Sequence, residues 1–481
     1  MNILSWEIID RPLLIRGDGG LFPEKTLSAG YFFGFGRLMP LPHSQHLFMS
    51  KKPKIQRASG MRDILPEEQK YFQKILDVAE SVVDFYGFKK ISTPILEETE
   101  LFSKGTGLLT DIVQKQMYNL KTKGGDFLSL RPEFTPGVIR AYIEHGMKNF
   151  PQPIKLYSYG PLFRYEHSQA GRQRQFHQFN IEVIGEGDPV IDAQVIQIFY
   201  NILNELKLKN LIVEVNSIGD PQCRAYYKKV LTSFLKHKES LLCPDCRRRL
   251  RENPLRILDC KEEKCQKITS QAPQIIDHLC EDCHKHFKGV LEFLDEIELP
   301  YRLNPYLVRG LDYYTKTVFE IFTDEVQKTE DSKPGARIAL VGGGRYDNLV
   351  KILGGESTFA GGGAMGMERL VIAMKNRDIK FIKSDDRSIF LAQIGGMAKR
   401  KGLKLLEEFR KAKIEVGESF GKDSLKSQLK IADRMKAKYT LLLGQREALE
   451  GSIIIRDMEN GKQETVKIES AVKEIQKRLK K

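Results

Sequence analysis

One stretch of the chain, residues 160 to 185, constrains the fold more than any other: GPLFRYEHSQAGRQRQFHQFNIEVIG. Apolar, β-prone sequence at its two ends flanks a polar run rich in arginine, glutamine and histidine. This pattern predicts two antiparallel strands joined by a long basic loop. Arg164, Arg172 and Arg174 would then lie near strand ends, where a sheet holds guanidinium groups rigidly against an anion. We expect that anion to be a phosphate.

The length and net charge of the chain limit the number of domains and the kinds of partner to expect. A chain of 481 residues is too long for one hydrophobic core, so two to four domains are expected. No run reaches the ~18 apolar residues of a membrane helix, and we expect no membrane partner. The formal net charge of +14 favours a polyanionic partner, because neutralised phosphates release counterions. Cytoplasmic localisation is expected, since the chain has no secretory signal and its cysteines are therefore predicted to be reduced.

The first 48 residues differ from the rest. They mix aromatic residues, glycine and proline without a helical or strand period, and their acidic residues argue against a transit peptide. We therefore expect translation to start at Met49, with the preceding leader an artefact of the gene model or a disordered tail.

Residues 58–102 predict a turn, a helix and a strand. Pro66 and an acidic first turn start an amphipathic helix that ends near Phe85. Its apolar face consists of Ile64, Leu65, Phe72, Ile75, Leu76, Val82 and Val83. The following segment, 89–102, is expected to be one strand, with Pro94 at an edge or interface where no ladder donor is needed.

Two strands around a Lys/Gly turn are expected next, followed by the loop LRPEFT and a helix that begins near Pro136. Glu133 and Thr135 stand just before that helix. One interpretation is purely structural, with Thr135 as the N-cap. The other is that this polar pair binds a ligand, and the two interpretations are compatible.

Seven cysteines lie in a helical, charged segment from Cys223 to about residue 300. Its two C-x-x-C pairs, Cys243 with Cys246 and Cys280 with Cys283, have the spacing of tetrahedral zinc ligands. The alternative is that these are reduced cysteines packed as small hydrophobic residues. Both interpretations stay open, and no metal ligand is counted among the site residues.

Glycine-rich segments dominate the last part before residue 375. RGLDYY, 309–314, precedes a buried strand, and ALVGGGRYDNLV, 339–350, opens a strand into three glycines that allow close backbone approach to a ligand. AGGGAMGMERLVIAM, 360–374, predicts a strand, glycines and a helix with Glu368 and Arg369 on its first turns. The glycines fit neither a dinucleotide nor a Walker pattern.

From Ser388 onward, apolar strands alternate with helices, after a charged linker at 375–388. This alternation predicts a small α/β domain with a mostly parallel sheet.

Together these motifs resemble the class II aminoacyl-tRNA synthetases over roughly the last nine-tenths of the chain. The helix, strand and Pro94 resemble motif 1, the 160–185 stretch motif 2, and 360–374 motif 3. RGLDYY and GGGRYD are typical of the histidyl branch. The resemblance implies an α+β fold, with an antiparallel sheet flanked by helices, a helical insertion and a C-terminal small α/β domain. The implied parts are 49–222 and 301–383 for the catalytic domain, 223–300 for the insertion, and 384–481 for the anticodon-binding domain.

The resemblance also implies an activity and its partners. A histidine–tRNA ligase converts histidine and ATP, with Mg2+, to histidyl-adenylate and pyrophosphate, and then transfers histidine to the 3′ end of tRNA(His). A homodimer is implied, and DNA is not a partner.

The resemblance assigns roles to individual residues. Arg164 and Arg309 would be catalytic, on opposite sides of the α-phosphate, and Gln169 would contact the tRNA acceptor end. ATP-binding roles fall to Arg164, Glu166, Arg172 and Arg369. Histidine-binding roles fall to Glu133, Thr135, Gln178, Glu182, Tyr313 and Tyr314.

The sequence argues against two other classes of protein. A catalytically inactive relative that regulates ATP phosphoribosyltransferase would usually lack the arginine of RGLDYY or the C-terminal domain, and this chain has both. A generic basic RNA-binding protein would account for the charge but not for the pocket motifs.

Overall fold

The computed structural model describes residues 55–108, 110–166, 172–323, 339–379 and 388–479. Three expectations lie outside these ranges: the leader with a start at Met49, the contact of Gln169, and most of the charged linker. Within the ranges, no helix combines the length and apolar character that crossing a bilayer requires.

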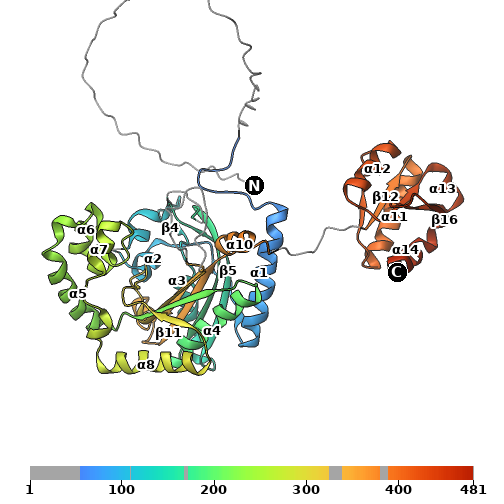
Figure 1. The fold of residues 1–481 in the computed structure, drawn as a ribbon. Coiled ribbons are helices and arrows are strands. Elements are labelled where there is room, and N and C mark those ends of the chain that lie inside the picture. Colours follow the sequence, from blue (N-terminus) through green and yellow to red (C-terminus); the bar gives the residue numbers. More distant parts are fainter. Residues whose placement is uncertain (1–54, 109, 167–171, 324–338, 380–387, 480–481) are drawn as a thin grey trace, which may run out of the picture. The chain divides into compact units, whose positions relative to one another are not determined.

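A large, mainly antiparallel sheet carries the candidate site (Figure 1). In the described residues it has eight strands, in the spatial order β1 (Lys89–Lys90), β5 (Ile154–Phe163), β6 (Gln175–Ile184), β11 (Ala360–Gly366), β10 (Val341–Arg345), β9 (Thr315–Thr323), β7 (Leu211–Ser217) and β8 (Tyr301–Leu303). Only the outer pairs, β1 with β5 and β7 with β8, are parallel. The predicted hairpin of β5 and β6 is confirmed, with Phe163 opposite Gln175 beside the loop.

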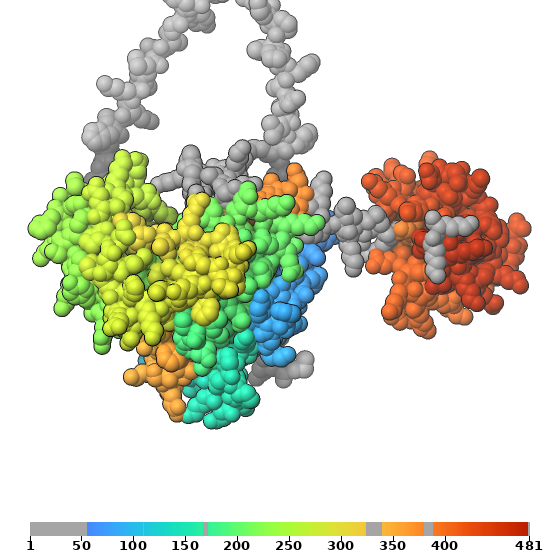
Figure 2. All heavy atoms as spheres, turned by 60° about the horizontal axis from the view of Figure 1, so that its bottom comes forward, coloured from blue at the N-terminus to red at the C-terminus, as the bar shows by residue number. Residues whose placement is uncertain are grey.

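Helices cover one face of this sheet because their apolar stripes meet the apolar side of the strands. These helices are α1 (Pro66–Phe85), α4 (Pro189–Glu205), α8 (Glu281–Glu296) and α10 (Met367–Asn376). Figure 2 shows α8, α4 and α1 side by side on one face of the molecule. The bounds predicted for α1 are confirmed, and Phe72, Ile75 and Val83 of its predicted face are buried. Leu65 is instead 66% exposed, because it is the N-cap residue and precedes the helical stripe.

The segment expected to be a single strand at 89–102 is not one. It contains β1, the short strand β2 (Leu96–Glu98) and the start of α2 (Thr99–Thr106). Between the strands, the guanidinium of Arg131 donates to the carbonyl oxygens of Thr93, at 2.7 Å, and Pro94, at 3.4 Å. A side chain therefore takes the acceptors that a neighbouring strand would otherwise use. β2 instead joins β4 (Phe127–Leu130) and β3 (Tyr118–Lys121) in a small separate sheet.

The expected start of the helix after LRPEFT needs one correction. α3 (Thr135–Glu144) begins one residue earlier than predicted, and its N-cap residue is Phe134, which makes no capping side-chain bond. Thr135 is therefore not the N-cap, and its hydroxyl is available for another partner.

The segment after β7 is helical, as predicted. It contains α5 (Pro221–Lys236), α6 (Pro244–Glu252), the 3-10 turn η4 (Pro254–Ile257), α7 (Glu263–Thr269) and the 3-10 turn η5 (Ile275–His278), and it ends in α8. Its buried residues form one apolar cluster with Tyr313, Tyr314 and Tyr346 of the sheet region. The helical segment is thus packed directly against the part of the molecule that carries RGLDYY.

The C-terminal domain is an α/β unit with its own core. Its strands, in spatial order, are β13 (Val416–Glu418), β12 (Ile389–Gln393), β14 (Tyr439–Leu443), β15 (Ser452–Asp457) and β16 (Gln463–Lys467). Its helices are α11 (Gly396–Lys411), α12 (Leu425–Arg434), α13 (Gln445–Glu450) and α14 (Ala471–Leu479).

The prediction of a mostly parallel sheet in this domain is wrong. β12 is parallel to both neighbours, but the pairs β14–β15 and β15–β16 are antiparallel. β16 was not expected, because its sequence QETVK is polar and almost wholly exposed at a sheet edge. A tight turn joins it to β15, with Asp457 accepting the backbone N–H of Glu459 and Gly461 in the left-handed region at φ 73°.

Candidate active site

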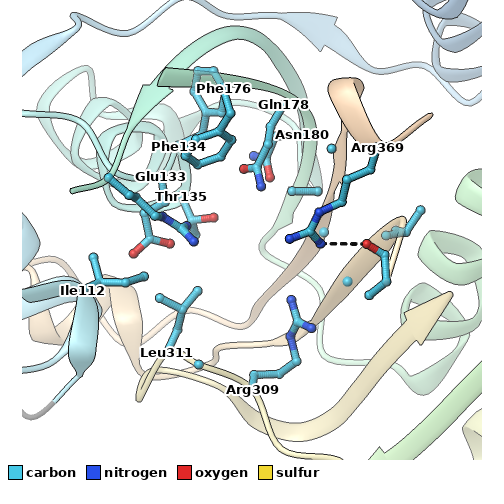
Figure 3. Close-up of a pocket in the computed structure, with 18 of the residues that line it drawn as sticks. Ile112, Glu133, Phe134, Thr135, Phe176, Gln178, Asn180, Arg309, Leu311 and Arg369 are labelled. Carbon is cyan, nitrogen blue, oxygen red and sulfur yellow. Dashed lines mark hydrogen bonds between the residues drawn. The ribbon is translucent and has the colours of Figure 1, made fainter. Parts of the chain in front are cut away.

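A cavity of about 280 Å³ opens where the large sheet, α10 and the RGLDYY segment meet (Figure 3). Nearly every residue proposed from the sequence lines it: Glu133, Thr135, Arg164, Glu166, Arg172, Gln178, Arg309, Tyr313, Tyr314 and Arg369. Glu182 lies behind the lining, and Gln169 is outside the described residues. Arg174 does not line the cavity, because its guanidinium stacks 3.9 Å from the ring centroid of Tyr165.

Part of the cavity floor is backbone, at Gly342 and Gly363 of two paired strands. β10 and β11 pair with Gly343 opposite Gly363 and Gly344 opposite Gly362. A Cβ on Gly343 would lie 2.3 Å from the carbonyl oxygen of Gly362, so only glycine fits this close approach. The close approach at Gly343 is therefore between two strands, and the expected approach of this backbone to a ligand stays a prediction.

Glu133 is the anchor of one end of the cavity. It is buried, and its two carboxylate oxygens accept hydrogen bonds from the hydroxyls of Thr106, at 2.5 Å, and Tyr313, at 2.7 Å. Burial raises the pKa of Glu133 in spite of these bonds. A cationic group in the cavity would stabilise the ionised carboxylate.

Glu182 forms a second buried acid close by. Its Oε1 accepts a hydrogen bond of 2.7 Å from Asn180, and Thr135 also bonds to the carboxyl group. Oε2 is buried and has no hydrogen-bond partner among the described residues, and the same is true of the hydroxyl of Tyr346. Burial raises the pKa of Glu182 to about 8. A buried acid with an unused oxygen is a typical hydrogen-bonding group for a polar ligand.

Four arginines bring positive charge to the other end. Arg369 is partly buried, donates to the carbonyl oxygen of Ala339 at 2.7 Å, and points into the same space as Arg309 (Figure 3). Burial, together with the charges of Arg172, Arg164 and Arg309, lowers the pKa of Arg369 to about 10. Guanidinium groups gathered around one space favour an anion between them, and several of them suit a polyphosphate.

The surroundings fix two of these guanidinium groups in place. Arg164 donates to the carbonyl oxygen of Pro132 at 3.0 Å and lies 5.3 Å from the ring centroid of Phe176. Arg309 forms an ion pair with Glu320 of β9. Such fixed donors are suited to stabilising negative charge that grows during a reaction.

Sequence reasoning missed Glu320, Asn180 and Tyr346. Glu320 had a detectable signal, since it is the charged residue in the otherwise apolar run TVFEIF. Asn180 and Tyr346 belong to segments that were singled out, but their roles depend on which neighbour each side chain meets. Glu368, noted from the sequence only for its helix position, accepts the backbone N–H of His177 at 3.0 Å and lines the cavity.

The predicted grouping of the cysteines is wrong. Cys243 and Cys246 do not meet Cys280 and Cys283 but cluster with Cys260 and Cys265. Cys280 and Cys283 lie instead beside Asp220 and Cys223 at the start of α5. The reason is the path of the chain: α7 returns to α6, whereas the start of α8 lies against the start of α5.

Comparison with known proteins agrees with this architecture. The family model "Histidyl-tRNA synthetase" matches residues 60–370, and the model "Anticodon binding domain" matches residues 389–478.

Individual relatives cover nearly the whole described chain. The histidine–tRNA ligase of Desulfitobacterium hafniense is 44% identical over 89% of this chain and 99% of its own length. That of Acetivibrio thermocellus is 43% identical over 87% and 98%. The crystal structure of the apo histidyl-tRNA synthetase of S. aureus superposes with a TM-score of 0.71 at 35% identity, and covers 87% of this chain and 99% of the solved one. With its sheet, its cavity and its matches taken together, the chain belongs to the histidyl-tRNA synthetase family.

Proposed function

We propose that the chain is a histidine–tRNA ligase that first joins histidine to AMP and then transfers it to the 3′-terminal ribose of tRNA(His). One observation carries the proposal: an arginine cluster and the buried acid Glu133 line one cavity of about 280 Å³, and a second buried acid, Glu182, lies behind this lining. The arginines suit the phosphates of ATP, and the acids suit an amino acid with a polar side chain.

In the first step, the histidine carboxylate attacks the α-phosphorus of ATP and pyrophosphate leaves. Neither this step nor the transfer requires a protein nucleophile, so alignment and charge stabilisation are the main contributions of the protein. We assign Arg164 and Arg309 to opposite sides of the α-phosphate, where negative charge grows. Arg172 and Arg369 would hold the rest of the nucleotide, with Glu166 beside them in a 3.6 Å ion pair to Arg172.

ATP would enter as its magnesium complex. Mg2+ prefers oxygen ligands, and it usually combines substrate phosphates and water with one or two carboxylates. Glu166, Glu320 and Glu368 are the carboxylates on the arginine side of the cavity, and Glu320 is already paired with Arg309. Glu368 already accepts the His177 backbone N–H with both oxygens, so Glu166 is the better candidate for this role.

Histidine would occupy the end with the acids. We assign its α-ammonium to Glu133, Thr135 and Gln178, because a cation compensates the buried carboxylate of Glu133. Tyr313 would orient that carboxylate through its 2.7 Å hydrogen bond. We assign the imidazole to Glu182 and Tyr314. A site that pairs both ring nitrogens rejects apolar analogues strongly, since its own polar groups would be left unpaired.

The domain boundaries that we propose follow those of the family. We propose residues 49–222 and 301–383 as the catalytic domain, 223–300 as an insertion, and 384–481 as the anticodon-binding domain. Gln169 remains our proposal for a contact to the tRNA acceptor end. The free cysteines, six of them buried and Cys280 partly exposed, favour a reducing, cytoplasmic setting.

We also propose a homodimer. A groove beside Pro94, Leu101 and Ile352 lies on the element that resembles motif 1. Ile95, Leu96 and Ile352 are each more than 40% exposed, which favours burial against a second copy. Light scattering behind size-exclusion chromatography tests this, and a monomer at micromolar concentration would contradict it.

The decisive experiment is ATP–pyrophosphate exchange on the purified chain, with histidine compared against the other amino acids. We expect exchange that depends on histidine and falls by ~10²-fold or more in Arg309→Ala. Charging of tRNA(His) then tests the second step. Histidine binding without any exchange would instead favour the regulatory relative of ATP phosphoribosyltransferase, which the placement of Arg309 inside the cavity argues against.

A further inference from the structure

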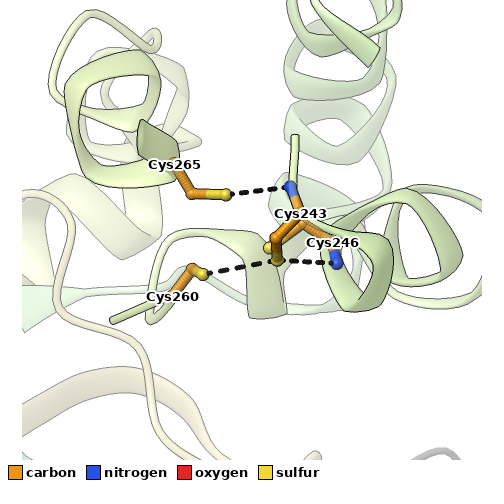
Figure 4. Close-up of side chains that lie close together, drawn as sticks. All are labelled: Cys243, Cys246, Cys260 and Cys265. Atoms are coloured by element: carbon orange, nitrogen blue, oxygen red, sulfur yellow. Dashed lines mark hydrogen bonds between the residues drawn. The ribbon is translucent and has the colours of Figure 1, made fainter. Parts of the chain in front are cut away.

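Four cysteine side chains converge in the helical segment at a distance from the proposed active-site chemistry (Figure 4). The Sγ atoms of Cys243, Cys246, Cys260 and Cys265 all lie within 4.8 Å of one another, and those of Cys243 and Cys260 are 3.9 Å apart. In a tetrahedral zinc site with Zn–S bonds of about 2.3 Å, neighbouring sulfurs are about 3.8 Å apart. The four thiols therefore already have nearly the spacing that one ion requires.

The local backbone has the form of a zinc knuckle. Cys243 is the N-cap residue of α6, and its Sγ accepts the backbone N–H of Cys246 at 3.4 Å. The Sγ of Cys265 accepts the backbone N–H of Cys243 at 3.3 Å. Such N–H···S bonds and the helix N-terminus both stabilise thiolates. The spacings C-x2-C and C-x4-C are within the usual range for paired zinc ligands.

The helices around these cysteines depend on tertiary contacts for their stability. α6 has nine residues and α7 has seven, which is too short for either helix to be stable alone. All four cysteines are at most 7% exposed, and no disulfide links them. Arg247, Arg248 and Arg249 follow Cys246 directly and supply positive charge beside a tetrathiolate centre, which carries net negative charge.

We propose that Cys243, Cys246, Cys260 and Cys265 bind one zinc ion as a structural site. Soft thiolate ligands in tetrahedral arrangement select zinc over the hard cations. An iron–sulfur cluster would need room for its own iron and sulfide atoms between the thiolates, and four sulfurs this close leave room for a single ion.

The site would also act on the catalytic cavity through η4, which lies between Cys246 and Cys260. Arg256 of η4 donates to the backbone carbonyl oxygen of Arg309 at 3.4 Å, and Asn253 donates to Asp312 at 3.0 Å. Arg249 and Arg256 both contact Asp111, at 3.0 Å, beside Ile112 of the cavity wall. The ion would thus fix the position of η4, and with it the contacts of Asn253 and Arg256 that support the backbone of RGLDYY.

The second group, Asp220 with Cys223, Cys280 and Cys283, differs in its donors. Asp220 already accepts the backbone N–H of Cys223 with one oxygen, at 2.8 Å, and contacts the thiol of Cys280 with the other. Cys280 is partly exposed. This group offers an internal comparison for the test.

The test is the zinc content of the purified full-length chain, measured by mass spectrometry after gel filtration. We expect at least one ion per chain, and Cys260→Ser should lose one ion relative to the unmodified chain. Ala272→Ser, which buries a hydroxyl in the same apolar cluster but removes no thiol, should keep it. Cys283→Ser should keep at least one ion. A zinc-free native chain, a Cys260→Ser variant with unchanged zinc, or a Cys283→Ser variant without zinc would each overturn the proposal.

A second measurement needs no variant. The chain produced with cobalt(II) in place of zinc should show thiolate-to-metal charge transfer and the d–d absorption of a tetrahedral tetrathiolate. A folded chain that takes up no cobalt would overturn the proposal even where Cys260→Ser fails to fold.

Discussion

The guanidinium of Arg309 fills the space that a side chain at Gly342 would need. A Cβ on Gly342 would lie 2.5 Å from Cζ of Arg309 and 2.3 Å from one of its terminal nitrogens. The ion pair with Glu320 holds Arg309 in this position from β9, so strand and glycine together determine where the charge points.

This relationship predicts the effect of Gly342→Ala. The methyl group should displace the flexible end of Arg309 at little cost in stability, but remove a charge that is positioned for the transition state. We expect kcat for histidine-dependent pyrophosphate exchange to fall by ~10²-fold, with an almost unchanged melting temperature. The control is Gly361→Ala, whose methyl group would make only ordinary contacts of 3.5 Å or more. Equal kcat in both variants would contradict the assignment.

Tyr313→Phe tests the orientation of Glu133. The change removes a 2.7 Å hydrogen bond to a buried carboxylate, and such bonds contribute ~1.5–3 kcal/mol. We expect KM for histidine to rise by about 10- to 100-fold, with a smaller effect on KM for ATP. Tyr159→Phe, on β5 outside the cavity lining, should leave both values unchanged. A rise of the two KM values in parallel would argue for a general loss of structure.

The raised pKa of Glu182 predicts a pH effect on the ligand-free chain. Its pKa is about 8 when folded and 4.5 ordinarily, so the folded chain holds a proton that the unfolded chain has released. The contribution to stability is complete below about pH 4.5 and is lost as the pH rises through about 8.

Glu182→Gln mimics the protonated acid and has no proton to lose. The decline in melting temperature between about pH 5 and about pH 8 should therefore be smaller in this variant than in the unmodified chain. Glu356→Gln replaces a side chain that is 74% exposed and should leave the decline as it is. Identical pH profiles for Glu182→Gln and the unmodified chain would show that the acid is ionised throughout.

A comparison of Arg256 with Arg249 tests whether the contact from η4 supports the RGLDYY segment. Both contact Asp111 at 3.0 Å, but only Arg256 also reaches the backbone of Arg309. We expect Arg256→Ala to lower kcat of the exchange reaction by about tenfold. Arg249→Ala should retain most of the activity. The opposite order of effects would show that the contact to Asp111, and not the contact to Arg309, is the important one.

Sequence reasoning succeeded where the information is local. The hairpin of β5 and β6 and the bounds of the helix α1 were predicted, because hydrophobic period, proline and acidic first turn lie within a few residues of one another. Most of the residues that line the cavity were singled out because each belongs to a short motif. Their meeting in one cavity followed from the family resemblance, since nothing in the spacing of Glu133 and Arg369 along the chain brings them together.

Sequence reasoning failed where the residues that contact one another are distant in the sequence. Four cysteines in two C-x-x-C pairs gave the wrong grouping, because the path of α7 decides which thiols meet. Arg131 interrupts the expected strand through carbonyl groups 37 and 38 residues away. The edge strand β16 has no apolar alternation to detect, since both of its faces are polar.

The glycine ladder of β10 and β11 has a consequence for how this site can be altered. At Gly342 and Gly363 the floor has no side chain that can be truncated to enlarge the space, and an added methyl group would meet Arg309 at the first position and Phe199 at the second. Engineering the site for a different amino acid would therefore have to work through its walls, at Glu182, Tyr313 and their neighbours. The glycine strands keep the floor the same in every such variant. The few side chains around the floor therefore determine which amino acids the cavity can accept.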